Sequence, residues 1–188
     1  MRLFQPRWFH HPLSVAAHRA PGNTESGSQT MKISELLAPE RIRIAAEAGG
    51  KKRALEILSE LLADTSQDLS RNQVFTSMLG RERLGSTAIG SGIAIPHGRI
   101  EGLEESIGAF IRLQDAVDFD AADGAPVDML FALIVPSQCA EEHLNALAAL
   151  AHMFSHADFC DMLRKAEGPE DICKLLRGFE TEAQQSPA

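Results

Sequence analysis

The sequence of 188 residues contains no tyrosine, 5% aromatic residues and 3 cysteines, and each scarcity excludes a class of protein. So few aromatic rings argue against a surface that stacks nucleic-acid bases. Three cysteines without a C-x-x-C pair exclude a disulfide framework and favour a reducing compartment. No apolar run approaches the roughly 18 residues that a membrane-spanning helix needs, so we expect no direct membrane insertion. Together these features predict a cytoplasmic protein.

Positive charge is also scarce, because 18 lysines and arginines stand against 26 acidic residues, a formal net charge of −8. Three of those basic residues and one acidic residue fall in 1–30, so the rest of the chain carries a net charge of −10. Such a chain is a poor binder of phosphate backbones, and no nucleic-acid partner is expected. Hydrophobic residues make up 44%, which suffices for the core of one domain.

The two ends of the chain differ from its middle. Residues 1–30 mix proline, glycine and small polar residues without a hydrophobic period, and we expect a disordered extension there. Since an ordered pattern begins at Met31, a start codon assigned too far upstream is one explanation, and a transit peptide is a weaker one. We predict one globular domain over 31–180 and a disordered tail over 181–188.

Helical and strand patterns alternate from Met31 onward. The expected helices cover 33–37, 51–63, 71–84 (with Ser70 as the N-cap), 137–156 and 170–176. The expected strands cover 41–45, 93–95, 107–113 and 127–135. This interleaving predicts an α/β fold, a single domain with a mixed β-sheet flanked by helices.

Several familiar catalytic motifs are absent. Gly85 and Gly90 have the spacing of a Walker A motif, but Ser91 and Gly92 follow where lysine and serine or threonine are required. The third glycine of a dinucleotide-binding loop, the G-x-S-x-G elbow of serine hydrolases and the H-E-x-x-H zinc motif are also missing. Nucleotide binding and serine hydrolysis are therefore not expected.

The most informative segment runs from Gly90 to Arg99, where a short apolar strand stops at Pro96 and delivers His97 at its carboxyl end. Strand ends of this kind are where α/β proteins usually place ligands. Gly98 removes side-chain bulk at a place where another molecule would approach. The alternative interpretation of His97 is an ordinary turn histidine.

Arg81 lies on the apolar stripe of an expected helix, at i+7 from Val74 and i+3 from Met78. A guanidinium in this position points inward or along the edge of the protein. It can hold an anion with two hydrogen bonds, or it can form a structural salt bridge. Arg83 lies off the stripe and should be solvated.

Three histidines fall in the helix expected before Ala157, and they differ in direction. His143 shares a stripe with Leu150, so it should face the core, either as a ligand or as an ordinary core histidine. His152 and His156 fall on the opposite side and should face solvent. This geometry disfavours a metal hydrolase that uses His97, His143 and His152, and no metal is expected.

From Met31 to about Gly178 the chain resembles the type-2 enzyme IIA domain of the bacterial phosphoenolpyruvate-dependent phosphotransferase system. The signature consists of Arg81-Glu82, Ser86-Thr87 and then Ile89-Gly-Ser-Gly-Ile-Ala-Ile-Pro-His97-Gly. The opening Met31-Lys-Ile-Ser-Glu-Leu-Leu looks most like the nitrogen-regulatory branch. Mannitol-type members tend to carry an acid where Ser91 stands, which also favours that branch.

The resemblance implies that His97 is phosphorylated on Nε2, that Arg81 lies near the phosphoryl group, and that His143 is the second active-site histidine. A neutral imidazole has a free lone pair for an incoming phosphoryl group. No cofactor, metal or nucleotide is required. Backbone N–H groups of the loop 85–92 can add donors, and the residues we expect to bind phosphate are Ser86, Thr87, Ser91 and Gly92.

The resemblance also implies partners. An HPr-like phosphocarrier protein would donate the phosphoryl group, and regulatory targets such as sensor kinases or potassium transport systems would respond to the phosphorylation state. Two alternatives stay open. A sugar-specific enzyme IIA would pass the phosphoryl group to a separate enzyme IIB, and a pure binding module would bind its partners without turnover at His97.

Overall fold

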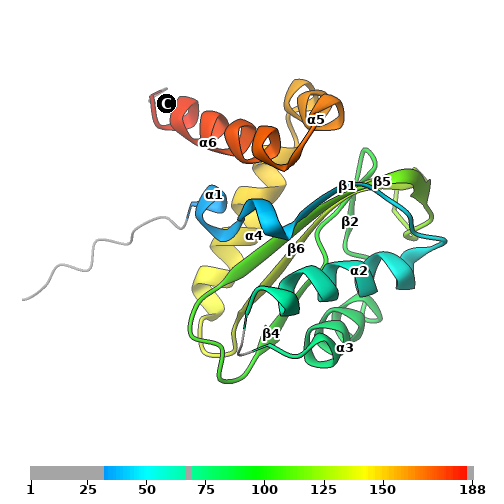
Figure 1. Ribbon diagram of the computed structural model, residues 1–188, viewed down its shortest axis with the longest axis vertical. Helices are drawn as coiled ribbons and strands as arrows, with labels where there is room; N and C mark the ends of the chain where they lie inside the picture. The colour runs from blue at the N-terminus through cyan, green and yellow to red at the C-terminus, as the bar shows by residue number, and fades with distance from the viewer. Residues whose placement is uncertain (1–31, 67–68, 186–188) are drawn as a thin grey trace, which may run out of the picture.

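The computed structural model describes residues 32–66 and 69–185. The extension expected over 1–30 and the last three residues of the expected tail lie outside this part of the chain. Figure 1 shows a central β-sheet with helices packed on both of its faces. The predicted α/β fold with a mixed sheet is therefore confirmed.

Six strands form the sheet: β1 (Ile42–Ala46), β2 (Ala88–Gly90), β3 (Ile93–Ala94), β4 (His97–Ile100), β5 (Ile107–Val117) and β6 (Val127–Pro136). Their order is β1-β5-β6-β3-β2, and β4 also pairs with β6. The sheet is mixed, since β3 and β4 run parallel to β6 while β5 runs antiparallel to it. The two short strands β3 and β4 thus follow the same side of β6, one after the other.

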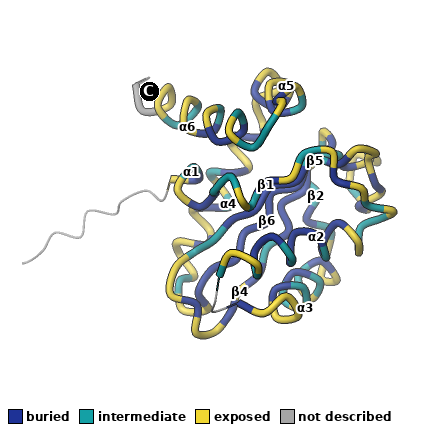
Figure 2. The backbone as a smooth tube through the Cα atoms, viewed as in Figure 1, coloured by how far each residue is buried: buried dark blue, intermediate teal, exposed yellow. Residues whose placement is uncertain are grey.

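Alternation along β6 creates two cores, because successive side chains of a strand point to opposite faces. The first core lies under α1 (Ile33–Leu36), α4 (Ala140–Phe154), α5 (Ala157–Lys165) and α6 (Pro169–Gln185), and β6 contributes Phe131 and Leu133 to it. The second lies under α2 (Lys51–Asp64) and α3 (Arg71–Glu82), and it receives Ala132 and Ile134. A 3₁₀ turn, η1 (Pro39–Arg41), precedes β1. β6 and the first part of β5, which lie between the helix layers, are almost entirely buried (Figure 2).

The long helix expected over 137–156 was wrong in its extent. It is α4, which ends at Phe154, and a separate helix, α5, begins at Ala157. The break occurs because His156 takes an extended backbone conformation and because the Ser155 hydroxyl donates to the carbonyl of His152. This turn redirects the chain so that Phe159 can pack into the first core.

The last helix is longer than expected. α6 continues from Pro169 to Gln185 and so enters the segment expected as a tail. Two contacts explain the added length. The rings of Phe159 and Phe179 lie 4.8 Å apart, and Ser34 donates from both its backbone N–H and its hydroxyl to the Glu180 carboxylate. Both partners are distant in the sequence, and local composition therefore did not indicate them.

Candidate functional site

His97 is the first residue of β4. The sequence had predicted that it ends the preceding strand, and this placement was wrong. Pro96 separates β3 from β4 because it has no N–H for the ladder. The Nδ1 atom of His97 lies 2.7 Å from the carbonyl oxygen of Ile95, so Nδ1 carries the proton and Nε2 carries a lone pair. That lone pair accepts a hydrogen bond of 3.0 Å from Nε of Arg81. The reactive nitrogen of this tautomer is therefore Nε2.

Arg81 reaches His97 because α3 packs unusually close to β4. A Cβ atom on Gly98 would lie 2.2 Å from the Ser77 hydroxyl and 3.2 Å from the Ser77 carbonyl carbon, so only glycine fits there. The group that approaches Gly98 is thus α3, not another molecule. Arg81 follows Ser77 by one helical turn, and its Nη1 also donates to the carbonyl of Gly85 over 2.9 Å. A capping box between Ser70 and Gln73 fixes the other end of α3.

His143 lies in the first turns of α4 and approaches His97 from the side opposite to Arg81. It is 5% exposed, as its position on the helix stripe predicts, and the two imidazole ring centroids are 5.2 Å apart. Burial first, and then the nearby His97, Arg99 and Arg81, together lower the pKa of His143 to about 4. Within residues 32–66 and 69–185, no group hydrogen-bonds to its buried Nδ1. His143 is thus a neutral imidazole with an open polar atom.

His97 is also a neutral imidazole near pH 7. Burial lowers its pKa below the ordinary 6.5, and the positive charges of Arg81 and Arg99 lower it further, against the raising effects of the Ile95 carbonyl and Glu82. Arg99 lies two residues along β4 and on the same face as His97, about 7 Å away along the strand. Its exposed guanidinium forms no ion pair within the described residues. Arg99 was not predicted as a site residue, although the alternation of an H-x-R strand could have indicated it.

A buried carboxylate holds the end of α3. Glu82 is 7% exposed, and it accepts hydrogen bonds from the backbone N–H of Thr87 (2.9 Å), the Thr87 hydroxyl (2.6 Å) and Nζ of Lys51 (2.8 Å). Lys51 also pairs with Asp120 at 2.7 Å. This network ties α2, α3 and the loop after α3 together, next to Arg81. Glu82 falls beside the apolar stripe, and its burial is explained by the three donor groups of its two partner residues, Thr87 and Lys51.

The four residues predicted to bind phosphate contact protein groups in the structure. The Ser86 hydroxyl donates to the carbonyl of Phe119, and both donors of Thr87 are directed at Glu82. Ser91 and Gly92 form the turn between β2 and β3, where the Ser91 N–H donates to Asp123. Four residues separate Gly92 from His97, so the two positions are five steps of an extended chain apart, roughly 16 Å. The structure brings together three of the predicted site residues, Arg81, His97 and His143. Phosphate binding by the other four stays a prediction.

The part of the chain that the structure describes holds no group of three or more His, Cys, Asp or Glu side chains that could hold a metal ion. His152 and His156 are exposed, as predicted, and their rings lie 5.0 Å apart beside Phe179. No helix among the described residues has the length and apolar character to span a membrane. The three cysteines are unpaired.

Comparison with known proteins identifies the class to which this fold and site belong. Residues 35–178 match the family described as "Phosphoenolpyruvate-dependent sugar phosphotransferase system, EIIA 2", and the chain belongs to this family. The resemblance found in the sequence is thereby confirmed.

Individual relatives narrow the comparison to one branch. The chain is 41% identical to the nitrogen regulatory protein of Pseudomonas aeruginosa, over 78% of this chain and 95% of that protein. It is 40% identical to the nitrogen regulatory protein of Escherichia coli, over 80% and 93% of the two chains. The crystal structure of nitrogen regulatory protein IIA-Ntr from Neisseria meningitidis superposes with a TM-score of 0.72 at 41% identity, covering 77% of this chain and 98% of that one. The mannitol IIA of Escherichia coli shares the fold, with a TM-score of 0.63 at 21% identity over 74% and 98% of the chains.

Proposed function

We propose that this protein is a phosphohistidine carrier of a phosphoenolpyruvate-dependent phosphotransferase system, and that it acts through protein partners as a nitrogen-regulatory signalling protein. In this proposal it accepts a phosphoryl group on Nε2 of His97 from an HPr-like protein. The observation that carries the proposal is the tautomer of His97. The Ile95 carbonyl holds the proton on Nδ1, and the Nε2 lone pair points toward a guanidinium.

The proposed step needs no proton transfer at His97. The Nε2 lone pair attacks phosphorus in line with the leaving nitrogen of the donor's phosphohistidine, a new N–P bond forms, and the old N–P bond breaks. The electron pair of the broken bond stays on the donor's imidazole. Because Nε2 carries no proton, His97 keeps its single proton on Nδ1, where the Ile95 carbonyl stabilises the charge that develops on the ring.

Arg81 and His143 then stabilise the transferred group. The Arg81 guanidinium leaves the Nε2 lone pair and donates to phosphoryl oxygens, which suits its planar array of donors. The open nitrogen of His143 lies in a buried setting, where an unpaired polar atom costs free energy. A hydrogen bond between that ring and the phosphoryl group would remove this cost. Transfer between phosphohistidines depends mainly on such positioning and charge stabilisation.

The regulatory role rests on the relatives. The relatives at 40 and 41% identity are named nitrogen regulatory proteins, and Ser91 stands where mannitol-type members tend to carry an acid. We therefore propose cytoplasmic protein targets, such as sensor kinases or potassium transport systems, that respond to the phosphorylation state of His97. The second candidate is a sugar-specific enzyme IIA, since the fructose-specific EIIA component of Haloferax volcanii is 32% identical over 77% of this chain and 94% of that protein.

Intact mass spectrometry tests the carrier chemistry. The protein is incubated with phosphoenolpyruvate, an enzyme I and an HPr-type carrier, alongside His97→Ala and His152→Ala. Because His152 is exposed and remote in the fold from β4, its variant is the matched control. We expect one added, acid-labile phosphoryl group on the wild type and on His152→Ala, and none on His97→Ala.

The outcomes separate the hypotheses. Phosphorylation that persists in His97→Ala would refute the assignment of the nucleophile. No transfer from several cognate carriers would favour a binding module that does not turn over. If the phosphorylated protein passes its group to an added enzyme IIB domain, the sugar-specific alternative replaces the regulatory one.

A further inference from the structure

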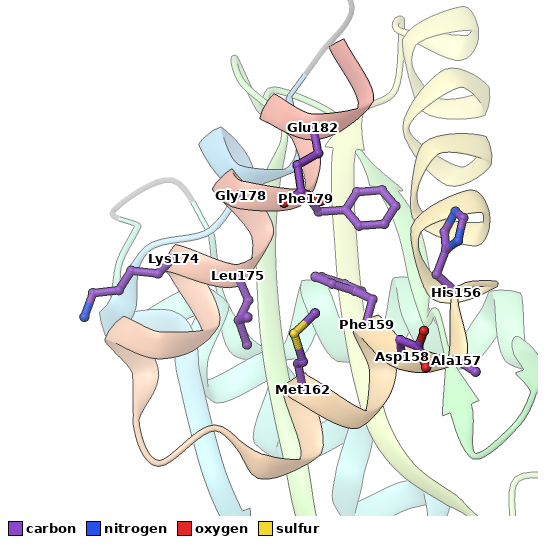
Figure 3. A pocket seen from close by; sticks show the side chains of 10 residues that line it. All are labelled: His156, Ala157, Asp158, Phe159, Met162, Lys174, Leu175, Gly178, Phe179 and Glu182. Carbon is purple, nitrogen blue, oxygen red and sulfur yellow. The ribbon is translucent and has the colours of Figure 1, made fainter. Parts of the chain in front are cut away.

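An apolar groove lies between α5 and α6, at the opposite end of the molecule from β4 (Figure 1). Figure 3 shows Phe159, Phe179, Met162 and Leu175 directed into the space between the two helices. The cavity measures about 490 Å³, and the Met162 side chain remains 47% exposed. Hollows of this size and lining accommodate bulky apolar side chains. Nothing in the proposed phosphoryl chemistry uses this groove.

The rim of the groove is charged, with an excess of acids. Asp158 at the start of α5 and Glu182 near the end of α6 line it, together with the single base Lys174. An occupant with an apolar body and basic flanks would therefore complement the groove. Charge complementarity of this kind helps to select a partner and fix its orientation.

The amino-terminal part of the described chain begins beside this groove. α1 packs on α6, where Ser34 donates two hydrogen bonds to Glu180, the residue that follows Phe179. The chain that precedes Lys32 therefore starts within about one helix diameter, roughly 10 Å, of the groove. Residues 1–31 precede it, and they carry the net positive charge that the rest of the chain lacks.

One part of that preceding segment matches the groove in chemistry. Residues 2–9 read Arg-Leu-Phe-Gln-Pro-Arg-Trp-Phe, so half of them are apolar and two are arginines. The tryptophan, Trp8, is the only one in the protein. Aromatic side chains next to a cation are the groups that bind best to an apolar hollow with an acidic rim.

We propose that residues 2–9 dock into the groove between α5 and α6 of the same molecule, with Trp8 in the apolar hollow and Arg7 near Asp158 and Glu182. Residues 10–31 connect the two sites. A random-coil linker of this length spans about 26 Å on average, more than the distance required. Because the linkage holds the segment near the groove at a millimolar effective concentration, modest contacts suffice for docking.

Fluorescence of the full-length chain tests this proposal, because all tryptophan emission comes from Trp8. Docking predicts emission at shorter wavelength, and slower acrylamide quenching, than for a synthetic peptide of residues 1–12. Met162→Asp places a charge in the groove at a partly exposed position, and we expect it to lower the docking equilibrium constant about tenfold. The matched control is Leu144→Asp on α4. Leu144 is more exposed than Met162 and lies outside the groove, so this variant should leave the emission unchanged.

Each contrary result overturns the proposal. Emission equal to that of the peptide means that Trp8 does not dock. A shift that survives Met162→Asp, in a variant whose far-ultraviolet circular dichroism shows it to be folded, means that Trp8 docks elsewhere. A shift that disappears on dilution means that the groove binds the segment of a second copy. Support requires a concentration-independent shift that Met162→Asp removes and Leu144→Asp keeps.

Discussion

Replacing Arg81 by methionine separates two opposing effects of the guanidinium on the proposed phosphorylation of His97. In the structure its Nε donates to Nε2 of His97 over 3.0 Å, and this bond must break before the lone pair can attack phosphorus. Removing it favours the reaction by about 1.5 kcal/mol, the low end of the range for hydrogen bonds to charged groups, because this bond is only partly buried. The lost stabilisation of charge in the transition state costs about 2.7–4 kcal/mol, as for removal of one preorganised donor.

The second effect is larger, so Arg81→Met should be slower than wild type. The difference of about 1.2–2.5 kcal/mol corresponds to a rate of phosphorylation roughly 8- to 70-fold lower. The pH dependence adds an independent signature. Arg81 helps to hold the pKa of His97 below its ordinary value, and the reaction needs neutral His97. The rate of the variant should therefore begin to fall at a higher pH than that of the wild type as the solution is acidified.

The assay is the initial rate of phosphoryl uptake, followed by intact mass at several pH values. Arg83→Met is the matched control, because it removes the same charge from an exposed residue at the end of α3. The reasoning is refuted if Arg81→Met is no slower than wild type, or if Arg83→Met is slowed as much. A slow Arg81→Met with an unshifted pH profile would refute only the electrostatic part.

Three further predictions concern stability. Gly98→Ala places a methyl group 2.2 Å from the Ser77 hydroxyl and should lower the free energy of unfolding in urea by about 1–3 kcal/mol; an unchanged midpoint would contradict the close packing of α3. Glu82→Ala leaves the two buried donors of Thr87 unpaired, while Lys51 keeps its bond to Asp120, and should cost about 2–4 kcal/mol, against less than about 0.5 kcal/mol for the exposed Glu101→Ala. Since the pKa of His143 is about 4 in the folded protein and near 6.5 when unfolded, the unfolded chain binds a proton that the folded chain does not between those pH values. Stability should therefore fall by about 2–3 kcal/mol on acidification from about pH 6.5 to 4, and an equal fall in His143→Gln would refute this origin.

The fold was predictable where the pattern is local and repeated. Ser70 caps α3 as its sequence indicates, and the apolar runs of β5 and β6 form the buried centre of the sheet. The short strands β2 and β4 were missed because their residues pair with β3 and β6, and a strand of three or four residues has too little alternation to detect. The turn at His156 and the continuation of α6 depend on aromatic contacts that no local rule encodes.

In the candidate site, too, the residues set by local sequence patterns were predictable and those set by contacts between distant segments were not. Arg81 and His143 were found because helical spacing places each on an inward stripe, and the structure brings both to His97. Glu82 was missed because its burial depends on Lys51 and Thr87, which approach it from two other segments. Gly98 was assigned to the approach of a ligand, and the group that approaches it is Ser77 of the neighbouring helix.

The placement of the site at the margin of two separate cores has a consequence for protein synthesis. Arg81 belongs to the helix layer on one face of the sheet and His143 to the layer on the other, and both side chains reach His97 at the start of β4. A nascent chain presents Arg81 and His97 before α4 has left the ribosome, and at that stage His97 lacks its second imidazole. Under the proposed function, a phosphoryl donor that requires all three side chains would not phosphorylate incomplete chains. The phosphorylated molecules would then all be complete and folded. A partner that binds the phosphorylated form would respond to the concentration of folded protein and not to the total concentration.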